Sequence, residues 1–153
     1  MRHAKSSFPD GVADHDRPLG ERGRRDAPAI GERLSTLGWA PELVLCSSAR
    51  RTRQTWGLIG PTLGDPPVRV LPELYLASPA QILACLRAHG RGTTAVVCHN
   101  PGVGELVYEA TGHVETITTC NAALLVSDED SWAEAVDSGW ELEDLLRPRP
   151  PRE

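Results

Sequence analysis

Apolar runs and helical patterns alternate along most of this chain. Between residues 24 and 37 the apolar side chains recur at the spacing of one helix face, and Gly38 supplies a stop. The apolar run 43–46 that follows is typical of a buried strand, and a second helix is expected over 50–59. The sequence thus predicts a strand that ends in a loop and leads into a helix.

The same order of elements is expected in the second half of the chain. Ser78 and Pro79 have the positions of an N-cap and a first-turn proline for a helix that ends at Gly90. The β-branched and apolar run 93–98 predicts a buried strand. The remaining predicted elements are a loop over 7–23, strands over 67–71, 122–126 and 132–136, a helix over 105–110, an edge strand over 140–145 and a frayed tail over 148–153.

Alternating strands and helices predict an α/β fold with three layers, α/β/α, around a mostly parallel central sheet. The length of 153 residues suits a single domain over 1–153 that buries its own core. In folds of this class, ligands bind at the carboxyl ends of the strands. Polar residues that follow the predicted strands are therefore the candidates for function.

Composition narrows the classes of function. The formal net charge of -5 argues against a general nucleic-acid-binding protein, which needs a basic surface. Neither a membrane span nor a signal peptide is recognisable, so we expect a cytoplasmic protein that does not bind membranes. The four cysteines lack the paired spacing of a zinc site or a disulfide framework, which predicts buried free thiols and no metal.

Arginine and histidine side chains stand where the predicted strands end. Arg2 and His3 open the chain, Arg51 lies in an arginine-rich stretch after a strand, and His99 directly follows another strand. Guanidinium groups bind phosphoryl oxygens, and a neutral imidazole can attack phosphorus. The sequence therefore predicts a phosphoryl-transfer site. No cofactor is expected, since the pair of glycines at 102 and 104 lacks the third glycine of a dinucleotide loop.

Six ordered segments carry a resemblance that spans nearly the whole chain. They are Arg2-His3-Ala4-Lys5-Ser6, Asp16-Arg17-Pro18-Leu19 with Gly23, residues 47–55, Glu73-Leu74-Tyr75, His99-Asn100-Pro101-Gly102 and residues 140–148. In these segments the chain resembles the histidine phosphatase superfamily (branch 1), and within it the small phosphohistidine phosphatases of the SixA type. The resemblance implies a phosphoglycerate mutase-like fold and phosphatase activity.

The resemblance also implies roles for the matched residues. His3 attacks phosphorus to form a phosphohistidine intermediate, which water hydrolyses, while Arg2, Arg51 and His99 hold the phosphoryl group. For this reaction the attacking nitrogen of His3 has to be neutral, which a backbone carbonyl bound to the other ring nitrogen would enforce. We expect His99 to serve best when protonated, because a bound phosphate raises its affinity for a proton.

The arginine-rich stretch needs an alignment to decide which side chain faces the site. The family pattern places the pocket arginine at Arg51 and leaves Arg50 and Arg53 on the helix surface. Arg17 and Asn100 belong to matched segments and are further candidates for binding the substrate.

Whether the site has a proton donor indicates which type of phosphorylated substrate it can hydrolyse. Glu73 is a candidate acid, but larger members of the superfamily carry their acid at the position where this chain has Leu76. An alkoxide leaving group needs a proton donor, whereas the imidazole of phosphohistidine leaves more readily. We therefore expect a phosphohistidine phosphatase with a phosphorylated protein as its partner. The alternatives are a phosphomonoesterase for a small phosphorylated molecule and a degenerate phosphate-binding module without turnover.

Only Met1 precedes the Arg2-His3 pair, although such a pair is expected at the end of a buried central strand. We therefore expect that the first strand is missing from this sequence, as it would be if the native chain started upstream of Met1. Without that strand, backbone groups of both neighbouring strands would be unpaired. We accordingly expect a groove or exposed strand edges beside Arg2 and His3.

Overall fold

A computed structural model describes residues 1–148 of the chain. The predicted frayed tail lies outside the described residues, except for its first position. The helices are α1 (Glu21–Thr36), α2 (Arg50–Ile59), α3 (Pro79–His89), α4 (Gly102–Thr111) and α5 (Trp132–Ala135), the strands are β1 (Leu43–Ser47), β2 (Val68–Leu71), β3 (Thr94–Val97), β4 (Ala122–Val126) and β5 (Glu141–Leu146), and short 3-10 turns cover Asp14–Asp16, Gly60–Leu63 and Pro72–Leu74.

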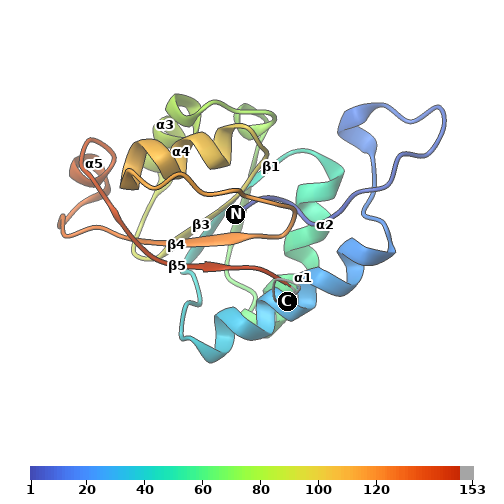
Figure 1. The fold of residues 1–153 in the computed structure, drawn as a ribbon, viewed down its shortest axis with the longest axis horizontal. Helices are drawn as coiled ribbons and strands as arrows, with labels where there is room; N and C mark the ends of the chain where they lie inside the picture. Colours follow the sequence, from blue (N-terminus) through green and yellow to red (C-terminus); the bar gives the residue numbers. More distant parts are fainter. Residues whose placement is uncertain (149–153) are drawn as a thin grey trace.

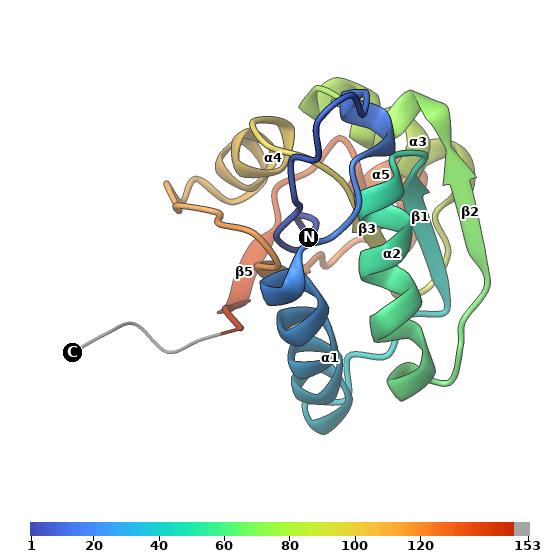
Figure 2. The same ribbon diagram turned by 90° about the vertical axis from the view of Figure 1, so that its right-hand side faces the viewer.

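Three layers form around a parallel sheet, as predicted. The sheet has the order β2-β1-β3, with every pair parallel, and all five residues of β1 are buried. Val44 and Cys46 of β1 pack in a core with α1 and α2, while Leu43 and Leu45 pack in a second core with α3 and α4. Helices α1 and α2 therefore cover one face and α3 and α4 the other (Figures 1 and 2), because the alternating side chains of a strand point to opposite faces.

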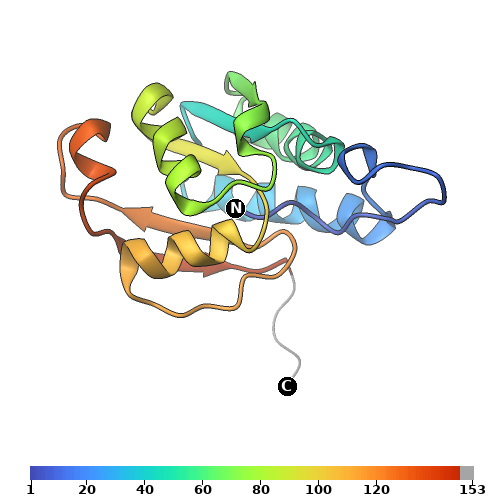
Figure 3. The same ribbon diagram turned by 90° about the horizontal axis from the view of Figure 1, so that it is seen from above.

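Strands β4 and β5 form a separate antiparallel pair. The first residues of the chain join this pair to the parallel sheet, since the N-terminus lies between β3 and β4 (Figure 3). On one side, the amides of Cys98 and His3 donate to the carbonyls of Met1 and Cys98. On the other side, the amides of Arg2 and Cys120 donate to the carbonyls of Asn121 and His3. Residues 1–3 thus occupy the end of a central strand position.

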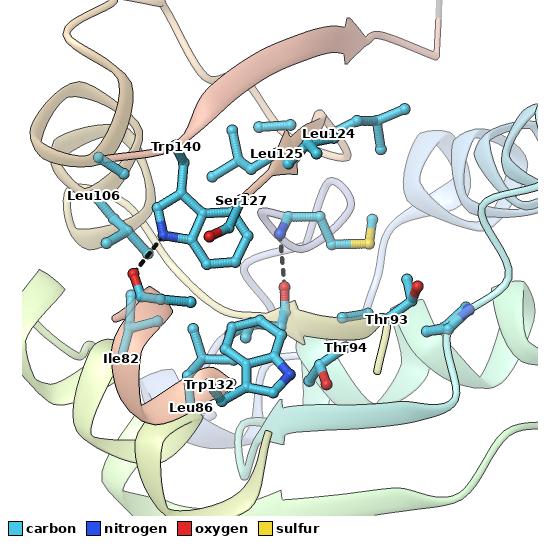
Figure 4. A pocket seen from close by; sticks show the side chains of 18 of the residues that line it. Ile82, Leu86, Thr93, Thr94, Leu106, Leu124, Leu125, Ser127, Trp132 and Trp140 are labelled. Carbon is cyan, nitrogen blue, oxygen red and sulfur yellow. Dashed lines mark hydrogen bonds between the residues drawn. The ribbon is translucent and has the colours of Figure 1, made fainter. Parts of the chain in front are cut away.

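A cleft continues the line of residues 1–3 on the side of Met1 away from His3. It has a volume of about 520 Å³ and lies between β3 and β4, with Leu124, Leu125, Trp132 and Trp140 on its walls (Figure 4). The amino group of Met1 donates a hydrogen bond of 2.6 Å to the carbonyl of Val96. Burial lowers the pKa of this amine to about 6. The cleft therefore borders Met1, whereas the groove was predicted beside Arg2 and His3, which do not line it.

The structure corrects one predicted element and extends others. Residues 132–135 form the helix α5, where the apolar pattern predicted a strand. The reason is a helix start that the pattern does not reveal, because the Ser131 hydroxyl accepts a hydrogen bond of 3.2 Å from the amide of Glu134. Helix α1 begins three residues earlier than predicted, and α4 also begins three residues earlier.

The cysteines and the helices of the described residues bear on disulfide bonds and on membrane spans. All four cysteines are buried and unpaired, as the sequence analysis expected. No helix within residues 1–148 is both long enough and apolar enough to cross a membrane.

Candidate active site

A pocket of about 250 Å³ lies at the carboxyl ends of β1 and β3. It brings together residues from five regions of the sequence that matched the predicted motifs or lie next to them, and in addition Thr119. The lining residues are Arg2, His3, Lys5, Ser6, Phe8, Asp14, Arg17, Arg51, Leu76, His99, Asn100 and Thr119. All the predicted site residues are among them, whereas Glu73 is an exposed residue that does not line the pocket.

His3 is a buried and neutral imidazole. Its Nδ1 lies 2.7 Å from the carbonyl oxygen of Ala4, which can only accept a hydrogen bond, so Nδ1 carries the proton. The lone pair is therefore on Nε2. Burial is the main cause that lowers the pKa of His3 to about 4, and Arg51 and Arg2 add to this effect. The ring thus has the tautomer and the charge that an attacking nitrogen needs.

His99 is also neutral in this structure, while its expected protonation on binding of a phosphoryl group stays a prediction. Burial, followed by the charge of Arg51, lowers the pKa of His99 to about 3. Its Nδ1 lies 3.4 Å from a terminal nitrogen of Arg51, which can only donate. Nε2 therefore carries the proton and donates to the hydroxyl of Ser47 at 2.7 Å. Sequence reasoning missed this partner, Ser47, although it is the last residue of β1.

Arg51 lies in the first turn of α2 and is only 3% exposed, whereas Arg50 and Arg53 of the same helix are exposed. This matches the predicted placement. One terminal nitrogen of Arg51 donates to the backbone oxygen of Asp14 at 2.8 Å, and the other lies 3.2 Å from the Asp14 carboxylate. The guanidinium thus faces both His99 and the loop over 7–23.

Arg2 and Arg17 complete a set of guanidinium groups around the pocket. Arg2 donates to the carbonyl of Ile117 at 3.3 Å, and Arg17 donates to the Ser6 hydroxyl at 2.5 Å and lies under the ring of Phe8. Within residues 1–148, the buried side-chain nitrogen and oxygen atoms without a hydrogen-bond partner are the Nε atoms of Arg2, Arg17 and Arg51. These side chains therefore have donor capacity that the protein itself does not use, which suits a site for an oxyanion.

Asp14 lines the pocket and Tyr75 contacts it from outside the lining, although the sequence analysis singled out neither residue for this site. The Tyr75 hydroxyl donates to the Asp14 carboxylate, which also forms ion pairs with Arg51 and with Arg17 at 3.2 and 3.6 Å. The hydrogen bond from Tyr75 is the largest cause that lowers the pKa of Asp14, and Arg51 contributes as well. The signal that could have found Asp14 is its place two residues before the matched segment that begins at Asp16.

Asn100 lines the pocket, but its side-chain amide also binds the backbone. Its Nδ2 donates to the carbonyl of Ile117 at 2.7 Å, and its Oδ1 accepts from the amide of Gly104 at 3.2 Å. A contact to substrate would therefore use only the remaining N–H of the amide. Asn100 connects the loop before β4 to the first turn of α4.

Close backbone approaches hold the segment after His3 in place. The amide of Ala4 donates to the Thr55 hydroxyl at 2.9 Å, and that hydroxyl donates to the carbonyl of Arg51 at 2.7 Å. A side chain at Gly23 would place its Cβ 2.2 Å from the Lys5 carbonyl oxygen, so only glycine lets α1 pack here. The segment that carries His3 and the first turn of α2 that carries Arg51 are thus fixed by the same short network.

Comparisons with known proteins agree with this geometry. The family model described as "Histidine phosphatase superfamily (branch 1)" matches residues 1–75. An uncharacterized chloroplastic protein of Arabidopsis thaliana is 34% identical over 97% of this chain and 76% of its own length. An uncharacterized protein of Mycobacterium tuberculosis is 44% identical over 69% of this chain and 66% of its own length.

Solved structures give the same result. A SixA-type protein from Nakamurella multipartitia is 30% identical with a TM-score of 0.85, and the match covers 97% of this chain and 93% of that chain. The protein histidine phosphatase SixA in complex with tungstate is 28% identical with a TM-score of 0.83, over 97% and 94% of the two chains. A mycobacterial glucosyl-3-phosphoglycerate phosphatase, 18% identical with a TM-score of 0.65, shares the fold. The chain therefore belongs to the histidine phosphatase superfamily (branch 1), as a phosphatase of the SixA type.

Proposed function

We propose that this phosphatase removes phosphoryl groups from histidine side chains of a protein, with His3 as the nucleophile. The observation that carries this proposal is that the carboxylate in the pocket is ionised. Asp14 is the single carboxylate among the lining residues within the described part of the chain, and its pKa is lowered. Because such a group is ionised at neutral pH, it has no proton to give to a leaving alkoxide. The pocket suits a leaving group that departs without a strong acid.

The chemistry of the leaving group separates phosphohistidine from a phosphate ester. An ester expels an alkoxide, which is a strong base, whereas phosphohistidine expels an imidazole. Leu76 lies on the pocket with 56% of its surface exposed and cannot donate a proton. A phosphomonoesterase for small molecules would need a proton donor for its leaving group, and no lining residue of this pocket within residues 1–148 fills that role.

The proposed reaction has two displacements at phosphorus. In the first, the Nε2 lone pair of His3 forms a bond to phosphorus, the bond from phosphorus to the substrate imidazole breaks, and the imidazole takes a proton from solvent. In the second, water attacks the phosphorus on His3, the bond from phosphorus to Nε2 breaks, and phosphate and a proton are released. Arg2, Arg17 and Arg51 stabilise the charge on the phosphoryl oxygens in both steps.

A protein substrate is supported by the mouth of the pocket. Phe8 lines the pocket and is 70% exposed, on the loop that begins at residue 7. Aromatic residues are enriched where proteins contact one another, so Phe8 is a candidate contact for a protein substrate. The similarity to the protein histidine phosphatase SixA, which was solved with tungstate, also supports a protein substrate.

Phosphate release from two substrates tests the proposal. A protein phosphorylated on histidine and glucose 6-phosphate are offered to the purified enzyme, with His3→Ala as the matched control. We expect kcat/KM for the phosphohistidine protein to exceed that for the ester by at least about 100-fold, the scale of missing acid catalysis. His3→Ala should release no phosphate. Faster ester hydrolysis would overturn the proposal, and no release from either substrate would favour the degenerate binding module.

A further inference from the structure

The Asp14 carboxylate occupies donors that a phosphoryl group would also use. It lies 3.2 Å from a terminal nitrogen of Arg51 and 3.6 Å from one of Arg17. Both arginines line the pocket beside His3 and His99. A negative group is therefore already paired with the cations that the proposed reaction needs for its substrate.

The position of this carboxylate is built into the fold. Tyr75 donates its hydroxyl proton to the same carboxylate oxygen that contacts Arg51. The ring of Tyr75 packs edge-on against His15 and His99, with ring centroids 4.8 and 5.5 Å apart. The 3-10 turn that carries Asp14 lies beside α2 (Figure 1). Contacts from three separate regions of the chain thus hold the carboxylate on the arginines.

We propose that Asp14 is an internal counter-anion that sets the affinity of the pocket for phosphoryl groups, by competing with them for Arg51 and Arg17. This inference rests on the proposed function. The Asp14 side chain is half-exposed, so it can turn to solvent when a phosphoryl group pairs with the arginines. A competing anion of this kind weakens the binding of substrate and product alike.

The charge of the pocket gives the reason for such a competitor. Arg2, Lys5, Arg17 and Arg51 are cations that line a cavity of about 250 Å³. These cations attract the product, inorganic phosphate, as strongly as they attract the phosphoryl group of the substrate. Such uniform binding does not accelerate the chemical step. By returning to Arg51 and Arg17, Asp14 replaces the departing phosphate and leaves neither of these two guanidinium groups without a counter-charge. Release of phosphate is thereby favoured.

Binding of inorganic phosphate to the intact chain tests the inference without any need for turnover. Asp14→Asn keeps the size of the side chain and removes its charge. We expect its Kd for phosphate, measured by titration calorimetry, to fall about fivefold, which is the scale of a half-exposed ion pair. Asp10→Asn is the control, because Asp10 is an exposed carboxylate of the same loop that does not line the pocket. An unchanged or weaker affinity in a folded Asp14→Asn protein would overturn the inference.

A second variant separates competition from a general effect on the loop. Tyr75→Phe removes the hydrogen bond that holds the carboxylate and should tighten phosphate binding in the wild-type background. In the Asp14→Asn background the same change should have no effect on Kd, because the competing charge is already gone. Equal effects in both backgrounds would contradict the inference. If the enzyme binds phosphate as described but does not hydrolyse phosphohistidine, the proposed function fails while this inference stands.

Discussion

The two histidines of the pocket are both neutral but present opposite nitrogens. His3 binds a backbone carbonyl through Nδ1, which leaves Nε2 free to attack. His99 accepts from Arg51 at Nδ1 and donates to Ser47 through Nε2, so it is held between a cation and a hydroxyl. We therefore propose that the same residue type serves as a nucleophile in one place and as part of the anion site in the other.

Titration of these imidazoles by NMR tests their environment. The folded pKa values are about 4 for His3 and about 3 for His99, below the ordinary value of 6.5. We expect their ring proton signals, assigned with His3→Asn and His99→Asn, to stay unshifted between pH 7 and 5. The unfolded rings take up protons below pH 6.5, so the free energy of unfolding should decrease as the pH falls from there toward 4. Titration of either ring near pH 6.5 would contradict this.

Arg51 and Arg50 form a matched pair of neighbours with opposite environments. Arg51→Ala removes a buried cation of the pocket, and we expect kcat/KM for phosphohistidine to fall about 100- to 1,000-fold, the cost of losing one preorganised charge donor. Arg50→Ala changes an exposed side chain and should alter kcat/KM by less than about threefold. Steady-state kinetics on both variants make the comparison. The reverse order of effects would mean that Arg50 supplies the pocket cation.

At the scale of elements, the ends of β1 and β3 and the first turn of α2 position the site. Ser47 ends β1, His99 follows β3 after one residue, and Arg51 is the second residue of α2. The N-terminal turn of α1 approaches the segment after His3 at Gly23. The site therefore depends on how closely the helices can pack onto the strand ends.

Two glycine substitutions test this dependence. Gly23→Ala would place a methyl group 2.2 Å from the Lys5 carbonyl oxygen, so α1 has to move away from the pocket. We expect a loss of about 1 to 3 kcal/mol in the free energy of unfolding, and a lower turnover. Gly57→Ala in α2 has no atom within 4 Å of the added carbon and should raise stability by about 0.5 to 1 kcal/mol. Urea unfolding and phosphate release measure both. A neutral Gly23→Ala would contradict the packing argument.

At the scale of the whole molecule, a parallel sheet and an antiparallel pair meet at the first residues of the chain and through apolar cores that both contribute to. Residues 1–3 bond to both, and beyond them the cleft of about 520 Å³ separates β3 from β4. The walls of this cleft are mostly strand edges and apolar side chains, among them four tryptophans. Stability here is therefore limited by the contacts across the cleft.

An added segment tests this limit. Five apolar, strand-forming residues placed before Met1 should lie in the cleft and turn its buried amine into a peptide N–H. Each buried side chain contributes about 1.5 to 3 kcal/mol, so we expect a higher Tm, and a higher turnover because His3 is better aligned. Five glycine and serine residues at the same place are the control. Equal Tm and turnover in the two proteins would show that the cleft does not accept a strand.

Much of this architecture follows from local pattern in the sequence. The spacing of apolar residues predicted β1, α2 and β4 with nearly their observed bounds, because each is a regular element with one or two buried faces. The motifs also predicted that Arg2, His3, Arg51 and His99 would meet, because parallel strands end at one edge of a sheet. The short helix α5 was predicted wrongly, because four residues carry too little periodicity to separate a helix from a strand.

Only the tertiary structure decided the charges and partners inside the pocket. Burial by surrounding elements makes His99 neutral, and its hydrogen bonds to Ser47 and Arg51 join residues that lie about fifty positions apart in the sequence. Asp14 meets Arg51 and Tyr75 only because the loop over 7–23 folds back onto the start of α2. A sequence pattern reports local geometry and the faces of elements, whereas protonation and ion pairing depend on distances that exist only once the chain has folded.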